Sequence, residues 1–236
     1  MRILLIHKHH YNLGGAEKYY LELSRLLSQK GHLVAHFSMH DARNEKSPWS
    51  KYFVSNIAYD EIKIRESPKI FSRMIYSFEA RKKIAKLLDD FNPDIAHVNN
   101  IYYHISPSIL PELKNPKIPI VYTLHDYHLL TPNVTFFHDG EVCEEVKDGL
   151  YKAIIHKSVK GSFLISFLTT TIAYIHNFLN IYKGNIDLFI APSLFMKKKM
   201  IEYGFNPRKI VYLPNFVEVA KHKNGYARNP YVFYFG

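Results

Sequence analysis

The sequence predicts an α/β fold in which a parallel sheet is flanked by helices. Residues 1–39 read as an apolar strand, a glycine turn, an amphipathic helix and a second apolar strand, which together form a crossover unit. Such units almost always join parallel strands through right-handed connections. Further strands are predicted at residues 94–98, 119–124, 187–191 and 210–213, with helical patterns between them.

The composition is that of an ordinary globular protein. Of the 236 residues, 47% are hydrophobic and 22% are charged, which suffices for one large domain or for one domain and part of another. The formal net charge of +10 favours an anionic partner such as a membrane surface or a phosphorylated substrate. Nucleic acid is not expected, because zinc-finger spacing and RNA-binding aromatic signatures are missing. The single cysteine, Cys143, fits a reducing cytoplasm.

The first strand, residues 3–6, leads through a polar loop to Gly14 and Gly15, and a helix extends from there to Lys30. Backbone N–H groups and the positive end of the helix dipole can face an anion at such a turn. Ligands of parallel α/β sheets bind at this edge. The alternative is that the glycines only permit a tight turn. The apolar face of the helix comprises Ala16, Tyr19, Tyr20, Leu23, Leu26 and Leu27.

The middle of the chain carries one long amphipathic pattern. Apolar spacing from Pro68 to Phe91, with Phe78 on the apolar side, predicts a single helix, whereas residues 40–67 are less regular, with a candidate short strand at 51–55. The basic residues of this helix indicate a solvated face, with attraction of a membrane or substrate as the alternative. They are Arg73, Arg81, Lys82, Lys83 and Lys86.

Polar and aromatic side chains follow two later strands. The strand at 94–98 leads into Asn99, Asn100, Tyr102 and Tyr103, before a short helix expected at 105–113. The strand at 119–124 ends in His125 and Asp126. Because the carboxyl ends of parallel strands meet at one edge, we expect these loops to lie beside Gly14 and Gly15.

An uncharged stretch from Gly161 to Tyr182 follows a predicted hairpin at Asp139-Gly140 and a predicted helix at 149–160. Its length approaches that of a membrane span, but its many hydroxyl and amide side chains make it too polar for one. We expect a helix largely covered by protein. A helix lying in a membrane interface is the alternative, favoured by lysines at both ends.

The end of the chain predicts a domain boundary. After the strand at 187–191, Ser193 caps a helix that runs to Tyr203, and a strand follows at 210–213. Residues 214–230 read as a linker, and residues 231–236 as the first strand of a second domain. The first domain is therefore predicted to span residues 1–213.

Six segments, in order and suitably spaced, resemble the N-terminal half of a family 4 glycosyltransferase. That family has the architecture called GT-B, which consists of two Rossmann-like domains. The resemblance covers essentially the whole chain, and residues 231–236 resemble the strand that opens the donor domain. The other segments are the opening strand with Gly14–Glu17, Pro93–His97, Thr123–Tyr127, Asp187–Ser193 and Lys209–Asn215.

The resemblance implies transfer of a sugar from a nucleotide-diphosphate sugar to a saccharide or lipid-linked acceptor, with retention and without an obligatory metal or further cofactor. It places the present chain on the acceptor side and assigns donor binding to a second domain that these residues do not contain. Residues 1–236 alone are therefore expected to have no transferase activity. A role in cell-surface polysaccharide synthesis is expected in the cytoplasm, with the inner face of the membrane as a candidate contact.

By the same resemblance, His125 is the leading catalytic candidate, hydrogen-bonding sugar hydroxyls near the reacting centre. Asp126 either orients His125 or caps its loop. The two glycines, Gly14 and Gly15, approach the diphosphate and sugar of the donor. Candidate acceptor contacts, each with a local structural role as the alternative, are Glu17, Asn99, Asn100, Tyr102 and Tyr103.

The sequence gives less support to other classes of protein. His7, His9 and His10 have the spacing of a chelate, but no acidic or thiol ligand completes a metal site. A nicotinamide-dependent oxidoreductase lacks support, because no Gly-x-Gly-x-x-Gly follows the first strand. A non-catalytic module that binds membranes through its basic surface is the remaining alternative.

Overall fold

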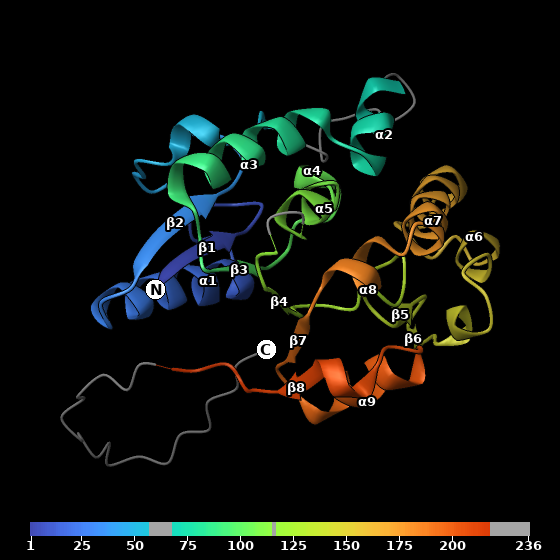
Figure 1. Cartoon of the computed structure of the whole chain (residues 1–236). Coiled ribbons are helices and arrows are strands. Elements are labelled where there is room, and N and C mark those ends of the chain that lie inside the picture. The colour runs from blue at the N-terminus through green and yellow to red at the C-terminus, as the bar shows by residue number, and fades with distance from the viewer. Residues whose placement is uncertain (57–67, 115–116, 218–236) are drawn as a thin grey trace, which may run out of the picture.

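The computed structural model describes residues 1–56, 68–114 and 117–217 (Figure 1). Its centre is a parallel six-stranded sheet with the strand order β2-β1-β3-β4-β7-β8, so the predicted fold class is confirmed. The strands are β1 (Arg2–Ile6), β2 (Leu33–Phe37), β3 (Ile95–Val98), β4 (Ile120–Thr123), β7 (Leu188–Ala191) and β8 (Ile210–Tyr212).

The sheet has a topological switch point between β1 and β3. From β1 the chain crosses to β2 on one side, and it then returns to place β3 on the other side of β1. The carboxyl ends of these neighbours are aligned, with Ile6 opposite Val98. Loops that leave two strands at such a point diverge and open a crevice for a ligand.

Helices cover both faces of the sheet. In Figure 1, α1 (Gly15–Gln29) lies on one face, while α3 (Phe78–Phe91) and α5 (Ile109–Lys114) lie on the other. The remaining helices are α2 (Pro68–Ile75), α4 (Tyr102–Ile105), α6 (Lys152–Ile155), α7 (Phe163–Phe178), α8 (Ile181–Asn185) and α9 (Leu194–Glu202), with 3₁₀ turns η1 (Ser50–Tyr52), η3 (Glu145–Lys147) and η4 (Pro207–Lys209).

Successive side chains of β1 point to opposite faces of the sheet, which explains why helices must cover both faces. Leu5 belongs to a small core with Tyr20 and Leu21 of α1, whereas Leu4 and Ile6 point into the larger core under α3 and α5. The side chains of Leu4, Leu5 and Ile6 are fully buried. Burying a side chain of this size contributes about 1.5–3 kcal/mol, which is why a central parallel strand reads as continuously apolar.

The helix predicted from Pro68 to Phe91 is in fact two helices, α2 and α3. Ser77 interrupts them, because its hydroxyl accepts a hydrogen bond from the backbone N–H of Ala80 at 3.1 Å and thereby caps α3. Phe78, expected on the apolar side, is 76% exposed, since it begins a new helix with its own direction. The apolar spacing continues across Ser77, so the break between the two helices cannot be recognised from the sequence pattern.

Three further predictions differ from the structure. Residues 51–55 form the end of η1 and a single β-bridge at Val54 instead of a strand. The helix predicted at 105–113 splits into α4 and α5 at Ser106, which precedes a proline and has a φ of +73°. The helix predicted at 149–160 shortens to α6, because Lys157 and Lys160 adopt positive φ.

Two local predictions are confirmed. Asp139 and Gly140 connect β5 (Phe137–His138) to β6 (Glu141–Val142) in a hairpin. The hydroxyl of Ser193 accepts from the N–H of Met196 at 3.0 Å and caps α9. The linker and donor-domain strand predicted at 214–230 and 231–236 lie largely outside the described residues, so they stay predictions.

The helix predicted at 161–182 corresponds to α7 and α8, and α7 has an inverted polarity. Ser166, Thr169 and His176 face the protein, whereas Phe167 and Phe178 face solvent. The prediction of a protein-covered helix therefore holds only for the polar face. Among the described residues, no helix combines the length and the apolar character needed to cross a membrane.

Candidate active site

The loops after β1, β3 and β4 meet at the switch-point edge of the sheet. The backbone N–H of Lys8 donates to the carbonyl of Asn100 at 3.0 Å, and the N–H of Asn99 donates to the carbonyl of Ile6 at 2.9 Å. His125 follows β4 and contacts Tyr19 of α1 at a ring separation of 5.2 Å. The structure thus brings His125, the β3 loop and the start of α1 to one edge.

Asn99 fixes the orientation of His125. Its side-chain amide donates to the carbonyl of Ile6 at 3.2 Å, so its oxygen accepts from His125 Nε2 at 2.9 Å. This assignment leaves Nδ1 of His125 as an acceptor. Burial lowers the pKa of His125 to about 4, so the ring is neutral near pH 7. A neutral imidazole in a fixed orientation can accept a proton or a hydrogen bond from a sugar hydroxyl.

Glu17 points into the protein, where only 6% of its surface is exposed. Its Oε1 lies 3.7 Å from Nε2 of His7, and His7 Nδ1 accepts from the backbone N–H of His9 at 3.0 Å. Burial and the neighbouring His125 keep the pKa of His7 well below its usual range. Glu17 therefore supports the inner side of the edge, which fits its structural alternative better than acceptor contact.

The two glycines have different surroundings. A Cβ at Gly14 would lie 3.4 Å from Oε2 of Glu17, whereas one at Gly15 would meet none of the described atoms within 4 Å. Within the described chain no side chain caps the start of α1 at Gly14. The first-turn N–H groups, which have no intrahelical acceptor, can therefore face an anion in the open space at Gly15.

Asp126 has the geometry of a loop cap. Its carboxylate accepts from the backbone N–H of His128 at 2.9 Å and from the hydroxyl of Tyr102. In the part of the chain that the structure describes, it makes no hydrogen bond to His125. Burial raises the pKa of Asp126, and the nearby Lys8 opposes this shift. Lys8 also lies over the ring of Tyr102, 5.4 Å from its centroid.

Apart from Glu17, the four remaining candidate acceptor contacts separate into two groups. Asn99, Asn100 and Tyr102 are buried and hydrogen-bonded within the protein, with the Tyr102 hydroxyl 2.8 Å from Oδ1 of Asn100. Their local structural role is therefore directly visible. Tyr103 is half-buried and packs edge-on against His128 at 5.2 Å, which leaves part of its ring accessible.

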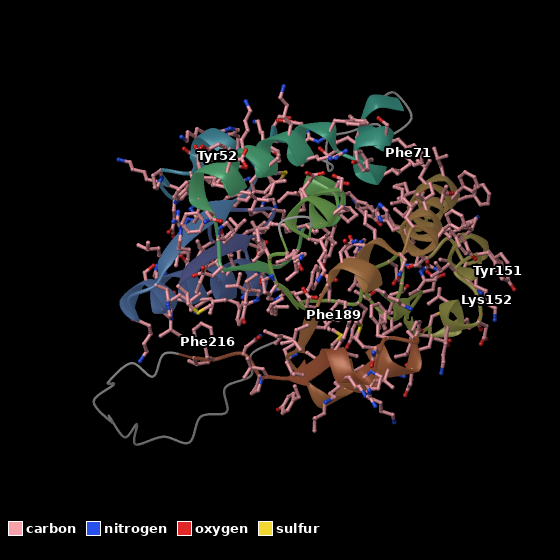
Figure 2. All side chains as sticks on the ribbon, viewed as in Figure 1. Tyr52, Phe71, Tyr151, Lys152, Phe189 and Phe216 are labelled. Atoms are coloured by element: carbon pink, nitrogen blue, oxygen red, sulfur yellow. The ribbon has the colours of Figure 1, made fainter. Side chains whose placement is uncertain are left out.

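Two residues at this edge were missed by the sequence prediction. Lys8 is the first formally charged residue after the apolar strand, and this position could have identified it. Tyr19 was placed on the apolar face of α1, but its ring contacts both His125 and Phe216, the latter at 5.5 Å. Figure 2 shows Phe216 below α1, where the last described residues pass the sheet. No sequence signal distinguished Tyr19 from a core residue.

The histidine rings of the β1 loop contact other residues of the protein, by hydrogen bonds at His7 and His10 and by ring packing at His9. His10 Nδ1 lies 2.9 Å from the hydroxyl of Tyr20, and His9 packs edge-on against His104 at 5.8 Å. Among residues 1–56, 68–114 and 117–217, no group of three histidine, cysteine or acidic side chains is arranged to hold a metal ion.

Comparison with known proteins yields a family and a fold. A model described as Glycosyltransferase Family 4 matches residues 13–221. An uncharacterized 42.6 kDa protein in the cps region of Klebsiella pneumoniae is 28% identical over 218 residues, which are 87% of this chain and 52% of that protein.

Two solved structures are similar at low sequence identity. Sucrose-phosphate synthase from Thermosynechococcus elongatus matches with a TM-score of 0.53 and 14% identity over 90% of this chain and 47% of its own. The lipopolysaccharide outer core galactosyltransferase WaaB matches with a TM-score of 0.49 and 14% identity over 94% and 47%. The chain spans about half the length of these relatives, and its Rossmann-like domain is of the GT-B kind. Because the family model matches most of its residues, the chain belongs to Glycosyltransferase Family 4.

Proposed function

We propose that the full-length protein transfers a sugar from a nucleotide-diphosphate sugar to a saccharide or lipid-linked acceptor, with retention, and that this chain forms the acceptor side. The observation that carries the proposal is the neutral His125, held by Asn99 at the switch-point edge beside the uncapped start of α1. Membership of a glycosyltransferase family argues against the alternative of a nicotinamide-dependent oxidoreductase.

The chemistry follows from this arrangement. The reaction builds negative charge on the departing diphosphate, and first-turn N–H groups at Gly15 can stabilise it from a fixed position. Nδ1 of His125 accepts from a hydroxyl of the transferred sugar and so fixes the reacting carbon. We propose no obligatory metal, because these donors and the donor domain supply the positive potential. We propose that this chain forms one side of the cleft and is inactive without the donor domain.

The test is sugar transfer by the full-length protein and its His125→Ala variant. Loss of the imidazole should lower turnover by on the order of 10²-fold in a protein that remains folded, with the free energy of unfolding lowered by about 1–3 kcal/mol because Asn99 loses its partner. His32→Ala, which removes a histidine at the opposite end of the sheet, is the matched control and should keep full activity. A His125→Ala enzyme with wild-type turnover contradicts the proposal.

We further propose that the protein assembles cell-surface polysaccharide at the anionic inner face of a membrane. The relative from Klebsiella pneumoniae is described as a protein in the cps region. Phe163, Phe167, Tyr174 and Phe178 form an exposed aromatic surface on α7, here called the α7 aromatic face. Tyr151 and Lys152 project at the outer edge of the neighbouring α6 (Figure 2). Aromatic rings with flanking lysines suit the boundary between headgroups and acyl chains.

Vesicle binding tests this second proposal. Phe178, which is 90% exposed, contributes little to the fold, so Phe178→Ser should change the free energy of unfolding by less than about 0.5 kcal/mol. The variant should bind anionic phospholipid vesicles several-fold more weakly than the wild type, and Leu33→Ser, exposed at the start of the edge strand β2, should bind normally. Equal binding by all three proteins, or binding that is insensitive to lipid charge, contradicts the proposal.

A further inference from the structure

A cavity of ≈ 200 Å³ lies beside the candidate active site, between the loop after β4 and the helices α4, α7 and α8. Tyr103 and His128 form its wall on the side of the active-site loops. Asn177 and Asn180 are exposed and lie at its opening, whereas Tyr182 is buried at its inner end. The cavity therefore extends from solvent into the interior next to the loops that carry Asn99 and His125.

Two buried polar atoms belong to this wall. The hydroxyl of Tyr182 and Nδ1 of His128 have no hydrogen-bond partner among the described residues. The Tyr182 ring packs edge-on against Tyr122 and His176, at 6.2 and 5.9 Å, so its position is fixed. An unpaired buried polar atom costs about 1–3 kcal/mol, and this cost is avoided when a ligand supplies the partner.

The wall is polar but carries little charge. Burial lowers the pKa of His128 to about 3 and also lowers that of His176, so both rings are neutral near pH 7. None of the described lining residues is acidic, and the ammonium of Lys183 donates to the carbonyls of Tyr203 and Gly204. Neutral donors and acceptors beside aromatic and aliphatic surfaces suit a polyhydroxylated ring better than an ion.

The volume sets the size of the occupant. It is smaller than the ~300–1,000 Å³ of pockets for drug-sized ligands. At ~30 Å³ each, it corresponds to about seven water molecules, which is the scale of one sugar ring.

We propose that this cavity binds one neutral sugar residue of the acceptor, adjoining the residue that receives the transferred sugar. The inference rests on the proposed glycosyl transfer and adds a second subsite to it. Tyr103 and His128 link the two subsites, because they belong to the same loops as Asn99 and His125. The hydroxyl of Tyr182 forms a hydrogen bond to a hydroxyl of the bound ring.

Tyr182→Phe tests the subsite by removing only that hydroxyl. The full-length protein is titrated with the methyl glycosides of glucose, galactose, mannose and N-acetylglucosamine, to about 50 mM, and binding is followed by saturation-transfer NMR. One of the four should bind, and Tyr182→Phe should weaken it by about three- to tenfold. Tyr122→Phe is the matched control, since its hydroxyl is also buried and without a partner among the described residues but lies outside the cavity.

Ala173→Phe fills the cavity from α7 and provides an independent variant. It should abolish glycoside binding and raise the acceptor KM in the transfer assay while turnover at saturating acceptor stays near the wild-type value. Binding of none of the four glycosides, or equal binding by wild type, Tyr182→Phe and Ala173→Phe, overturns the subsite. If transfer depends on His125 but the acceptor KM is unchanged in Ala173→Phe, the proposed function stands and the subsite is rejected.

Discussion

The edge around His125 and the helix α7 both bury polar side chains, but the two regions differ in how these side chains are hydrogen-bonded and in what they expose to solvent. At the edge, His97 lies 2.7 Å from the hydroxyl of Thr123, and His125 lies 2.9 Å from Asn99, so buried groups fix one another. On α7, Thr169 and His176 are hydrogen-bonded to the carbonyls of Ile165 and Ile75, but the buried hydroxyl of Thr170 has no partner within the described residues, and aromatic rings point to solvent.

This difference separates two kinds of task. Polar groups that are already paired keep one geometry before any ligand arrives, as a reacting centre requires. Unpaired hydroxyls and exposed rings instead gain most when another molecule covers them. This contrast is consistent with the two proposals, which put the reaction at the edge and the recognition of acceptor and membrane at α7.

The largest expected effect is loss of stability in acid. Burial lowers the pKa of both His97 and His125 to about 4, below the value of ~6.5 in an unfolded chain. The unfolded state therefore binds more protons, and the stability present above about pH 6.5 is lost as the pH falls towards 4. Each ring should cost on the order of 2 kcal/mol at pH 5.

Urea unfolding between pH 7 and pH 4.5 measures this effect. His97→Gln should reduce the slope of the free energy of unfolding against pH without abolishing it, because one buried ring no longer titrates while His125 and His128 still do. A free energy of unfolding that is constant over this range would show that these histidines are already protonated, or solvated, in the folded protein.

A pair of isosteric substitutions sharpens the comparison directly. Thr123→Val removes a hydroxyl that is bonded to His97, and it should lower the free energy of unfolding by about 1–3 kcal/mol. Thr170→Val removes a hydroxyl without a described partner, and it should be neutral or stabilise by up to about 1 kcal/mol. Urea unfolding at pH 7 compares the two. Equal losses in both variants contradict the distinction between the two regions.

The fold could be predicted because its signals are local. Residues 3–6 are apolar over the length of a short buried strand, and Ser193 caps α9 by a rule that depends on three residues. The break at Ser77 could not be predicted in the same way. It is stabilised by Ser108, whose hydroxyl accepts from the backbone N–H of Ser77 at 3.1 Å across 31 positions of sequence.

The candidate site was predictable in location but less so in detail. Chain order and strand polarity place His125 at the edge of Gly14, because parallel strands share their carboxyl ends. Whether Asn100 and Tyr102 face solvent or one another depends on loop geometry, and both are buried. The inverted polarity of α7 was hidden for a related reason: spacing shows that two faces exist, but not which one the protein covers.

The smallest expected change in stability separates the structural role of Gly15 from its functional one. Gly15 begins α1 with open space around it, so Gly15→Ala should raise the free energy of unfolding by about 0.4–1 kcal/mol. Gly31→Ala is the contrasting control, because a φ of +82° makes alanine costly by about 1–2 kcal/mol. If the donor diphosphate approaches this turn, the stabilised Gly15→Ala enzyme should nevertheless transfer sugar more slowly, since its methyl group occupies that space. A variant that is more stable and fully active would make Gly15 an element of the turn alone, and it would move the anion site away from the start of α1.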